Sequence, residues 1–252
     1  MPFVFTRLGL MMRRDFLTFI DRPCLLCDQK QNHASGICGP CQNDLPWLAR
    51  ACPRCGIPWR HHTGAYNCFH NPPIFNHCQT AFAYDFPIKQ LILEFKESGN
   101  LAAGRALATC LALRLGLASP QHPLPDLLIP VPSSWQKQRQ RGYNPAALIA
   151  KDLARALNRP WTSGLIKAHP TQQDRKHQSR QQRLNDVTNP FYLNRTRAPC
   201  HIAIIDDVVT SMATANQVAA KLKAAGYHRI SLWALARSLP PNTPNRSNSI
   251  DD

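Results

Sequence analysis

The clustering of cysteines constrains this chain more than any other feature of its sequence. Eight of the ten cysteines lie within the first 78 of 252 residues. No apolar run approaches the roughly 20 residues that a membrane span needs. A basic pair, Arg13-Arg14, follows the short apolar stretch near the start instead of preceding it, which disfavours a secretory signal. Because clustered cysteines in a cytoplasmic protein bind metal more often than they form disulfides, we expect a cytoplasmic, metal-binding protein without a membrane span.

The change in composition after the cysteines predicts a domain boundary near residue 80. We expect a double zinc ribbon over residues 1–79 and a larger domain over residues 80–237. The segment 238–252 is rich in Pro, Asn and Ser, which is typical of a disordered tail.

The first four cysteines form two Cys-x-x-Cys pairs, Cys24/Cys27 and Cys38/Cys41, separated by ten residues. Four thiolates at this spacing are the ligand set of one tetrahedral structural Zn²⁺ ion, and such an ion folds a segment that has little apolar periodicity. The first set therefore predicts a structural zinc site.

A second set, Cys52, Cys55 and Cys68, lacks an obvious fourth member. Cys78 is the preferred fourth ligand, because a fourth thiolate would repeat the ligand set of the first site. A second site that binds no metal is the other possibility. The alternative ligands are His70, His77, and the His61/His62 pair.

The positive charge of the chain is concentrated in its middle. The net charge is +15, and residues 133–197 contain 13 Lys or Arg against three acids. Such a field suits a polyanion, either nucleic acid or a phosphorylated small molecule. Trp135, Tyr143 and Trp161 lie in this stretch and are candidates to stack on bases. The alternatives are a solvated basic surface and aromatic rings used in ordinary packing.

From residue 80 onward, short apolar runs alternate with segments of helical periodicity. The pattern predicts strands over 82–86, 127–131, 201–206 and 230–236, and helices over 88–96, 101–115, 146–157 and 214–225. This alternation is typical of an α/β fold with a parallel sheet and flanking helices. Ligands of such sheets bind beyond the carboxyl ends of the strands, so the segments after Val131 and after Ile205 are the candidate site loops.

Residues 202–214, IAIIDDVVTSMAT, place two aspartates at the end of a buried strand and a hydroxyl-rich turn before a helix. Backbone N–H groups at a helix start attract phosphate, and paired carboxylates accept hydrogen bonds from vicinal hydroxyls. The segment resembles the phosphoribosyl pyrophosphate loop of type I phosphoribosyltransferases. The resemblance implies that Asp206 and Asp207 contact the ribose, that Mg²⁺ binds with the pyrophosphate, and that the 5′-phosphate is wrapped by Thr210, Ser211, Met212, Ala213 and Thr214.

The order of motifs resembles the ComF/GntX family of competence-associated proteins: a cysteine domain, then Pro130-Val131-Pro132, then Arg141-Gly142-Tyr143-Asn144, then the Asp206-Asp207 loop. The resemblance implies a double zinc ribbon ahead of a type I phosphoribosyltransferase-like domain, and a role in natural transformation, which is the uptake of single-stranded DNA. Its implied partners are single-stranded DNA, a DNA-translocating helicase and proteins that handle incoming strands. The candidate groups for pyrophosphate or DNA are Lys137, Arg139, Arg141 and Tyr143.

Three positions depart from the family pattern. Met212 replaces the loop glycine, so its Cβ is expected to narrow the phosphate cradle or to force a strained backbone that costs about 1–3 kcal/mol. Pro145 replaces a glutamine but suits the first turn of a helix, and Ala65 replaces a cysteine of the second ribbon.

No segment is identifiable as a base-recognition element, and no catalytic residue is assigned, so turnover is left open. The preferred hypothesis is a DNA-handling protein. The alternatives are an active Mg²⁺-dependent phosphoribosyltransferase acting on a nucleobase or related acceptor, and a zinc-dependent adaptor without a ligand of its own.

Overall fold

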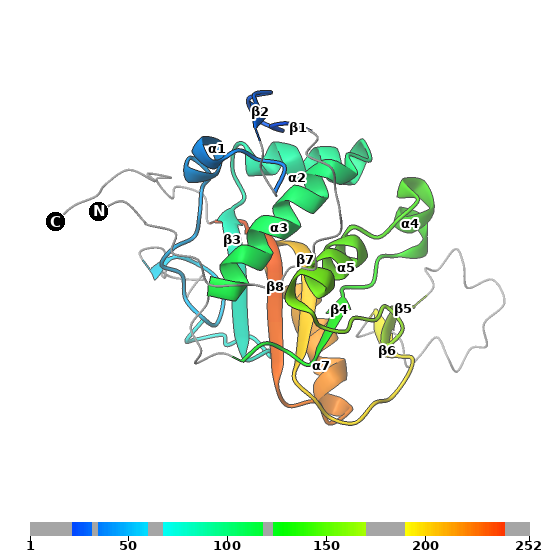
Figure 1. Ribbon diagram of the computed structural model, residues 1–252. Helices are drawn as coiled ribbons and strands as arrows, with labels where there is room; N and C mark the ends of the chain where they lie inside the picture. Colours follow the sequence, from blue (N-terminus) through cyan, green and yellow to red (C-terminus); the bar gives the residue numbers. More distant parts are fainter. Residues whose placement is uncertain (1–21, 32–34, 60–67, 118–122, 170–189, 240–252) are drawn as a thin grey trace.

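A four-stranded sheet in which every neighbouring pair is parallel forms the centre of the molecule (Figure 1). The computed structural model describes residues 22–31, 35–59, 68–117, 123–169 and 190–239. The strands lie in the order β3 (His77–Ala83), β8 (Ile230–Arg237), β7 (Ile202–Val209) and β4 (Leu127–Pro130). The predicted parallel α/β fold is therefore confirmed.

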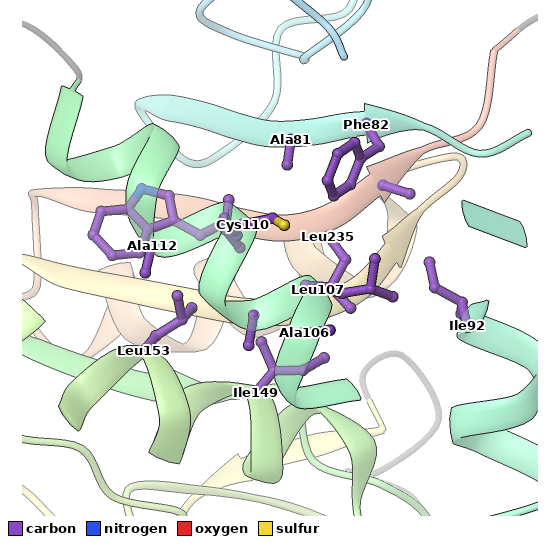
Figure 2. Close-up of a cluster of buried hydrophobic side chains, with 14 of the residues drawn as sticks. Ala81, Phe82, Ile92, Ala106, Leu107, Cys110, Ala112, Ile149, Leu153 and Leu235 are labelled. Carbon is purple, nitrogen blue, oxygen red and sulfur yellow. The ribbon is translucent and has the colours of Figure 1, made fainter. Parts of the chain in front are cut away.

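Three helices cover one face of the sheet and a fourth covers the other (Figure 1). The helices α2 (Ile88–Glu97), α3 (Leu101–Leu117) and α5 (Pro145–Leu157) share one hydrophobic core with the sheet, part of which is drawn in Figure 2. Helix α7 (Ala213–Ala224) packs on the opposite side with a second core. Because both faces are covered, all eight residues of β8 and the first four of β7 are buried, as parallel strands generally are.

Strand β3 is the element that the sequence placed least well. The prediction over residues 82–86 rested on aromatic residues, which are common in strands, whereas β3 starts at His77 and ends at Ala83. Its position is set by pairing with β8, from His77 opposite Ser231 to Ala83 opposite Arg237. Pairing thus outweighs the local preference of the residues that follow.

Smaller elements surround the sheet. The first cysteine pairs lie in a hairpin of β1 (Arg22–Pro23) with β2 (Lys30–Gln31) and a short helix α1 (Gly39–Asn43). Beyond β4 a short helix, α4 (Trp135–Arg141), projects from the body of the domain (Figure 1). Strands β5 (Ile166–Ala168) and β6 (Phe191–Leu193) form an antiparallel pair, and β6 contacts α7. Among the described residues, no helix is both long and apolar enough to cross a membrane.

Candidate functional site

Asp206 and Asp207 lie inside β7, directly before its last two residues, Val208 and Val209. The sequence predicted a strand ending at Asp206, but β7 continues to Val209 because β8 runs beside it as far as Arg237. Successive strand residues point to opposite faces. Asp206 therefore follows Ile202 and Ile204 toward the α7 side, and Asp207 points toward the α2 side.

Asp207 is held by a lysine that sequence reasoning missed. The Nζ atom of Lys96, in the last turn of α2, lies 2.8 Å from Oδ1 of Asp207, and both side chains are less than 20% exposed. A signal for this lysine exists in the helix: Lys96 continues the stripe of Ile88 and Ile92 at a spacing of four residues, and both isoleucines are fully buried. A cation on the buried stripe of a helix indicates an acidic partner in the core.

Asp206 has a pKa that is raised toward neutral pH. The pKa of Asp206 is raised from 3.8 to about 7, mainly by burial and secondly by the negative charge of Asp207. Its Oδ1 accepts a hydrogen bond from the backbone N–H of Asp207 at 2.9 Å, and Lys96 opposes the shift. The site therefore exchanges a proton close to neutral pH.

The turn between β7 and α7 adopts the strained conformation predicted for Met212. Met212 has φ +63° and ψ 3°, the left-handed region that glycine adopts without penalty, and it directly precedes α7. The surrounding residues Thr210, Ser211, Ala213 and Thr214 are exposed. The start of this 12-residue helix thus offers hydroxyls and amides to an anion, at a backbone cost of about 1–3 kcal/mol for Met212.

Helix α4 carries the basic candidates at the neighbouring strand end. The side chain of Ser134 caps the helix by accepting from the N–H of Lys137 at 3.4 Å, and Gly142 ends it with φ +80°. None of the seven residues is buried. The guanidinium of Arg139 lies 5.0 Å from the ring centre of Trp135, so a cation and an exposed aromatic ring form one surface.

Tyr143 serves packing, unlike its three basic neighbours in the candidate list. Its hydroxyl donates to the carbonyl of Phe95, and the two rings lie 5.7 Å apart. The next residue, Asn144, caps α5 by accepting from the N–H of Ala146 at 3.0 Å. Pro145 occupies the first turn of α5, as predicted. This junction fixes where α4 leaves the domain.

The first cysteine cluster has the geometry of a tetrahedral thiolate site. The Sγ atoms of Cys24, Cys27, Cys38 and Cys41 all lie within 4.8 Å of one another, and those of Cys27 and Cys38 are 3.7 Å apart. Zinc–sulfur bonds of about 2.3 Å in a tetrahedron place sulfurs about 3.8 Å apart. The N–H groups of Leu26 and Cys38 donate to Sγ of Cys24 at 3.4 Å, as expected around a metal-bound thiolate.

The second cluster repeats this arrangement with three thiols. Cys52, Cys55 and Cys68 lie within 4.8 Å of one another, with 3.7 Å between Cys52 and Cys68, and the N–H of Arg54 donates to Sγ of Cys52 at 3.4 Å. These residues fit a structural zinc ion bound through three thiolates and one further ligand.

The structure does not bring Cys78, the preferred fourth ligand, into this group. Cys78 lies in β3 opposite Leu232, and its thiol packs against the backbone of Gly56. The pairing of β3 with β8 holds it there. Neither His70 nor His77 joins the three thiols within the described part of the chain, and His61 and His62 lie outside the described residues.

The fold and the site define a class: a zinc-ribbon protein whose parallel α/β domain carries an acid pair at the end of a central strand. The sequence model of a double zinc ribbon domain matches residues 18–69, which contain both cysteine clusters.

Relatives of the chain match along most of its length. DNA utilization protein YhgH from Escherichia coli O157:H7 is 31% identical over 208 residues, which are 81% of this chain and 91% of that protein. Competence protein F from Haemophilus influenzae is 29% identical over 231 residues, or 88% of this chain and all of that protein. Competence protein ComFC from Bacillus subtilis is 24% identical over 235 residues, or 85% and 95% of the two chains. The chain belongs to the ComF/GntX family.

Similar solved structures include an adenine phosphoribosyltransferase from Leishmania donovani, which is 13% identical with a TM-score of 0.34 and covers 64% of this chain and 75% of that one. A similarity of this size has no bearing on activity.

Proposed function

We propose that this protein handles single-stranded DNA during DNA uptake and that α4 contributes the main binding surface. The relatives are named for competence and for DNA utilization, which supports a role in taking up or using DNA. The family resemblance adds a translocating helicase and strand-handling proteins as proposed partners.

The absence of any buried residue in α4 carries this proposal. A helix in a folded domain normally packs an apolar face, whereas α4 buries none of its seven residues and is capped at its two ends by Ser134 and Gly142. Its outward surface combines Lys137 and Arg139 with Trp135, whose side chain is 56% exposed. Cations that neutralise phosphates next to an aromatic ring that stacks on a base are the usual means of binding a single strand without sequence preference.

The sheet places α4 close to the acid-pair loop. Strands β4 and β7 are neighbours and run parallel, and α4 follows β4 while the turn at Met212 follows β7. Both segments therefore lie beyond the same edge of the sheet, where ligands of such folds bind. A sugar-phosphate at the turn and a strand on α4 would share this edge.

Replacing Lys137 and Arg139 by glutamine is expected to weaken binding of a fluorescent oligothymidylate about tenfold at low salt, because two phosphate contacts are lost. The slope of log affinity against log salt should fall by about 1.4, at about 0.7 for each contact with a single strand. Fluorescence anisotropy at several salt concentrations measures both. Trp135→Ala should weaken binding by about 1–3 kcal/mol with little change in slope.

The matched control removes the same charge elsewhere. Lys223, in the last turn of α7, and Arg229, directly before β8, are exposed at the other end of the sheet, so the double glutamine variant there should keep the wild-type affinity and slope. Equal losses in the two double variants would point to a general charge effect and contradict a site on α4.

The second candidate function is a Mg²⁺-dependent phosphoribosyltransferase, favoured by the acid pair and the exposed turn at Met212. Millimolar phosphoribosyl pyrophosphate with Mg²⁺ should then raise the melting temperature, since a ligand at 100 times its dissociation constant stabilises by about 2.7 kcal/mol. The double change Asp206→Asn with Asp207→Asn should abolish the shift. A wild-type protein that shows no shift would exclude this candidate and leave DNA binding to be judged separately.

A further inference from the structure

We propose that Arg237 and Met212 hold the turn after β7 against the second cysteine cluster, so that metal bound by Cys52, Cys55 and Cys68 sets the conformation of residues 209–212. Arg237 and Met212 are then positioning residues for the anion-binding turn. The inference relies on the proposed function only for the ligand of that turn, and its test uses neither DNA nor phosphoribosyl pyrophosphate.

Arg237 connects the two segments through hydrogen bonds. It is the last residue of β8 and only 2% exposed. Its Nε donates to the carbonyl of Cys55 at 2.9 Å, and its Nη1 donates to the carbonyls of Val209, at 2.9 Å, and Thr210. Because the guanidinium is a planar fork with donors in fixed directions, a shift of the Cys55 carbonyl must be followed by the turn or must leave a buried donor unsatisfied.

Met212 connects the same segments through apolar contact. Its side chain packs against the buried group formed by the three thiols of the second cluster and Ile57. A non-glycine residue at positive φ persists only where its surroundings hold it. The cysteine cluster supplies these surroundings together with the core on the α7 side, so the side chain that departs from the family pattern also anchors the turn.

The Cys-x-x-Cys pair of the second cluster, Cys52/Cys55, itself packs on the sheet. Gly56 has φ +72°, and a Cβ placed there would lie 3.1 Å from Sγ of Cys78 and 3.6 Å from Cδ of Arg237. The N–H of Cys78 donates to the carbonyl of Pro53 at 2.7 Å. Metal ligation through the thiol of Cys55 would therefore fix a carbonyl that already lies at the junction of β3, β8 and the turn.

The first cluster provides the contrast. Cys24 and Cys38 belong to the core on the α2 and α3 side, which does not include Met212. Loss of metal there should loosen a different part of the molecule.

The test compares Cys68→Ser with Cys27→Ser by zinc content and by amide hydrogen exchange, below the melting temperature of both variants. Each variant should lose one zinc ion per chain. Only Cys68→Ser should speed exchange of residues 209–212, by about tenfold or more, because local opening becomes easier. Arg237→Lys should speed hydrogen exchange of the same amides while both zinc ions remain bound. This variant tests the proposal if Cys68→Ser does not fold.

Three outcomes would overturn the proposal. One is zinc loss in Cys68→Ser with unchanged exchange at residues 209–212. Another is equal acceleration of these amides in Cys27→Ser. The third is a zinc content that is the same in Cys68→Ser as in the wild type.

Discussion

Replacing Cys38 by serine is expected to remove one zinc ion from the chain and to lower its melting temperature far below that of the wild type. Cys38 is 1% exposed and, with Cys24, lies in the same core as Phe82 and Leu107. Zinc binding to structural thiolate sites contributes about 10–16 kcal/mol in isolated zinc fingers, whereas whole domains are stable by only about 5–15 kcal/mol. Loss of even part of this contribution is a large fraction of the usual margin, so the melting temperature should fall strongly. Zinc release to a colorimetric chelator and thermal unfolding measure the two effects.

Cys110→Ser is the matched control for this change. Cys110 is fully buried in the same core, but no metal cluster among the described residues includes it. Burying a hydroxyl in place of its thiol should cost about 1–3 kcal/mol and leave the zinc content unchanged. Similar melting temperatures for the two variants would show that the core, and not the metal, determines the effect of Cys38.

Asp206→Asn is expected to stabilise the protein relative to the wild type at neutral and alkaline pH. The pKa of Asp206 rises from 3.8 to about 7 in the folded state because of burial and the neighbouring charge of Asp207. Between these values the unfolded chain releases the proton while the folded chain retains it, so wild-type stability falls as the pH rises from about 4 to about 7. Asparagine resembles the neutral carboxyl and removes this loss, which is on the order of 2–4 kcal/mol.

Urea unfolding at pH 5, 6, 7 and 8 measures this difference. The advantage of Asp206→Asn should grow up to about pH 7 and stay constant above it. Asp207→Asn should behave differently, because it leaves Lys96 without the carboxylate that lies 2.8 Å away. It should lower stability and also weaken the pH dependence, since the charge that raises the pKa of Asp206 is gone. Parallel stability curves for wild type and Asp206→Asn would contradict the assigned proton.

The features that the sequence predicted correctly depend on residues close together in the chain. The pairs Cys24/Cys27 and Cys38/Cys41 specify a ligand set by their spacing, and Pro145 specifies a helix start by its own geometry. The order of strands and helices follows from apolar periodicity. Each of these signals is contained in a short window of residues.

The features that it missed depend on pairing between distant segments. Lys96 meets Asp207 only because α2 packs on the face of β7, and Arg237 meets Cys55 only because β8 passes the second cluster. Cys78 lies outside the group of three thiols because the register of β3 against β8 places it opposite Leu232. No local window contains these partners, although a cation at the end of a fully buried strand or stripe does indicate that a partner exists.

The strand order also determines when the sheet can form during synthesis of the chain. β3 is the first strand of the sheet to be synthesised, and its partner in the sheet, β8, is the last and inserts between β3 and β7. The edges of β3 and β7 that face each other across this space therefore stay unpaired until residue 237 has been released, a situation that favours aggregation and slow folding. All seven cysteines of the two clusters have been synthesised by residue 68, so metal capture can precede closure of the sheet and give the nascent chain an early ordered segment.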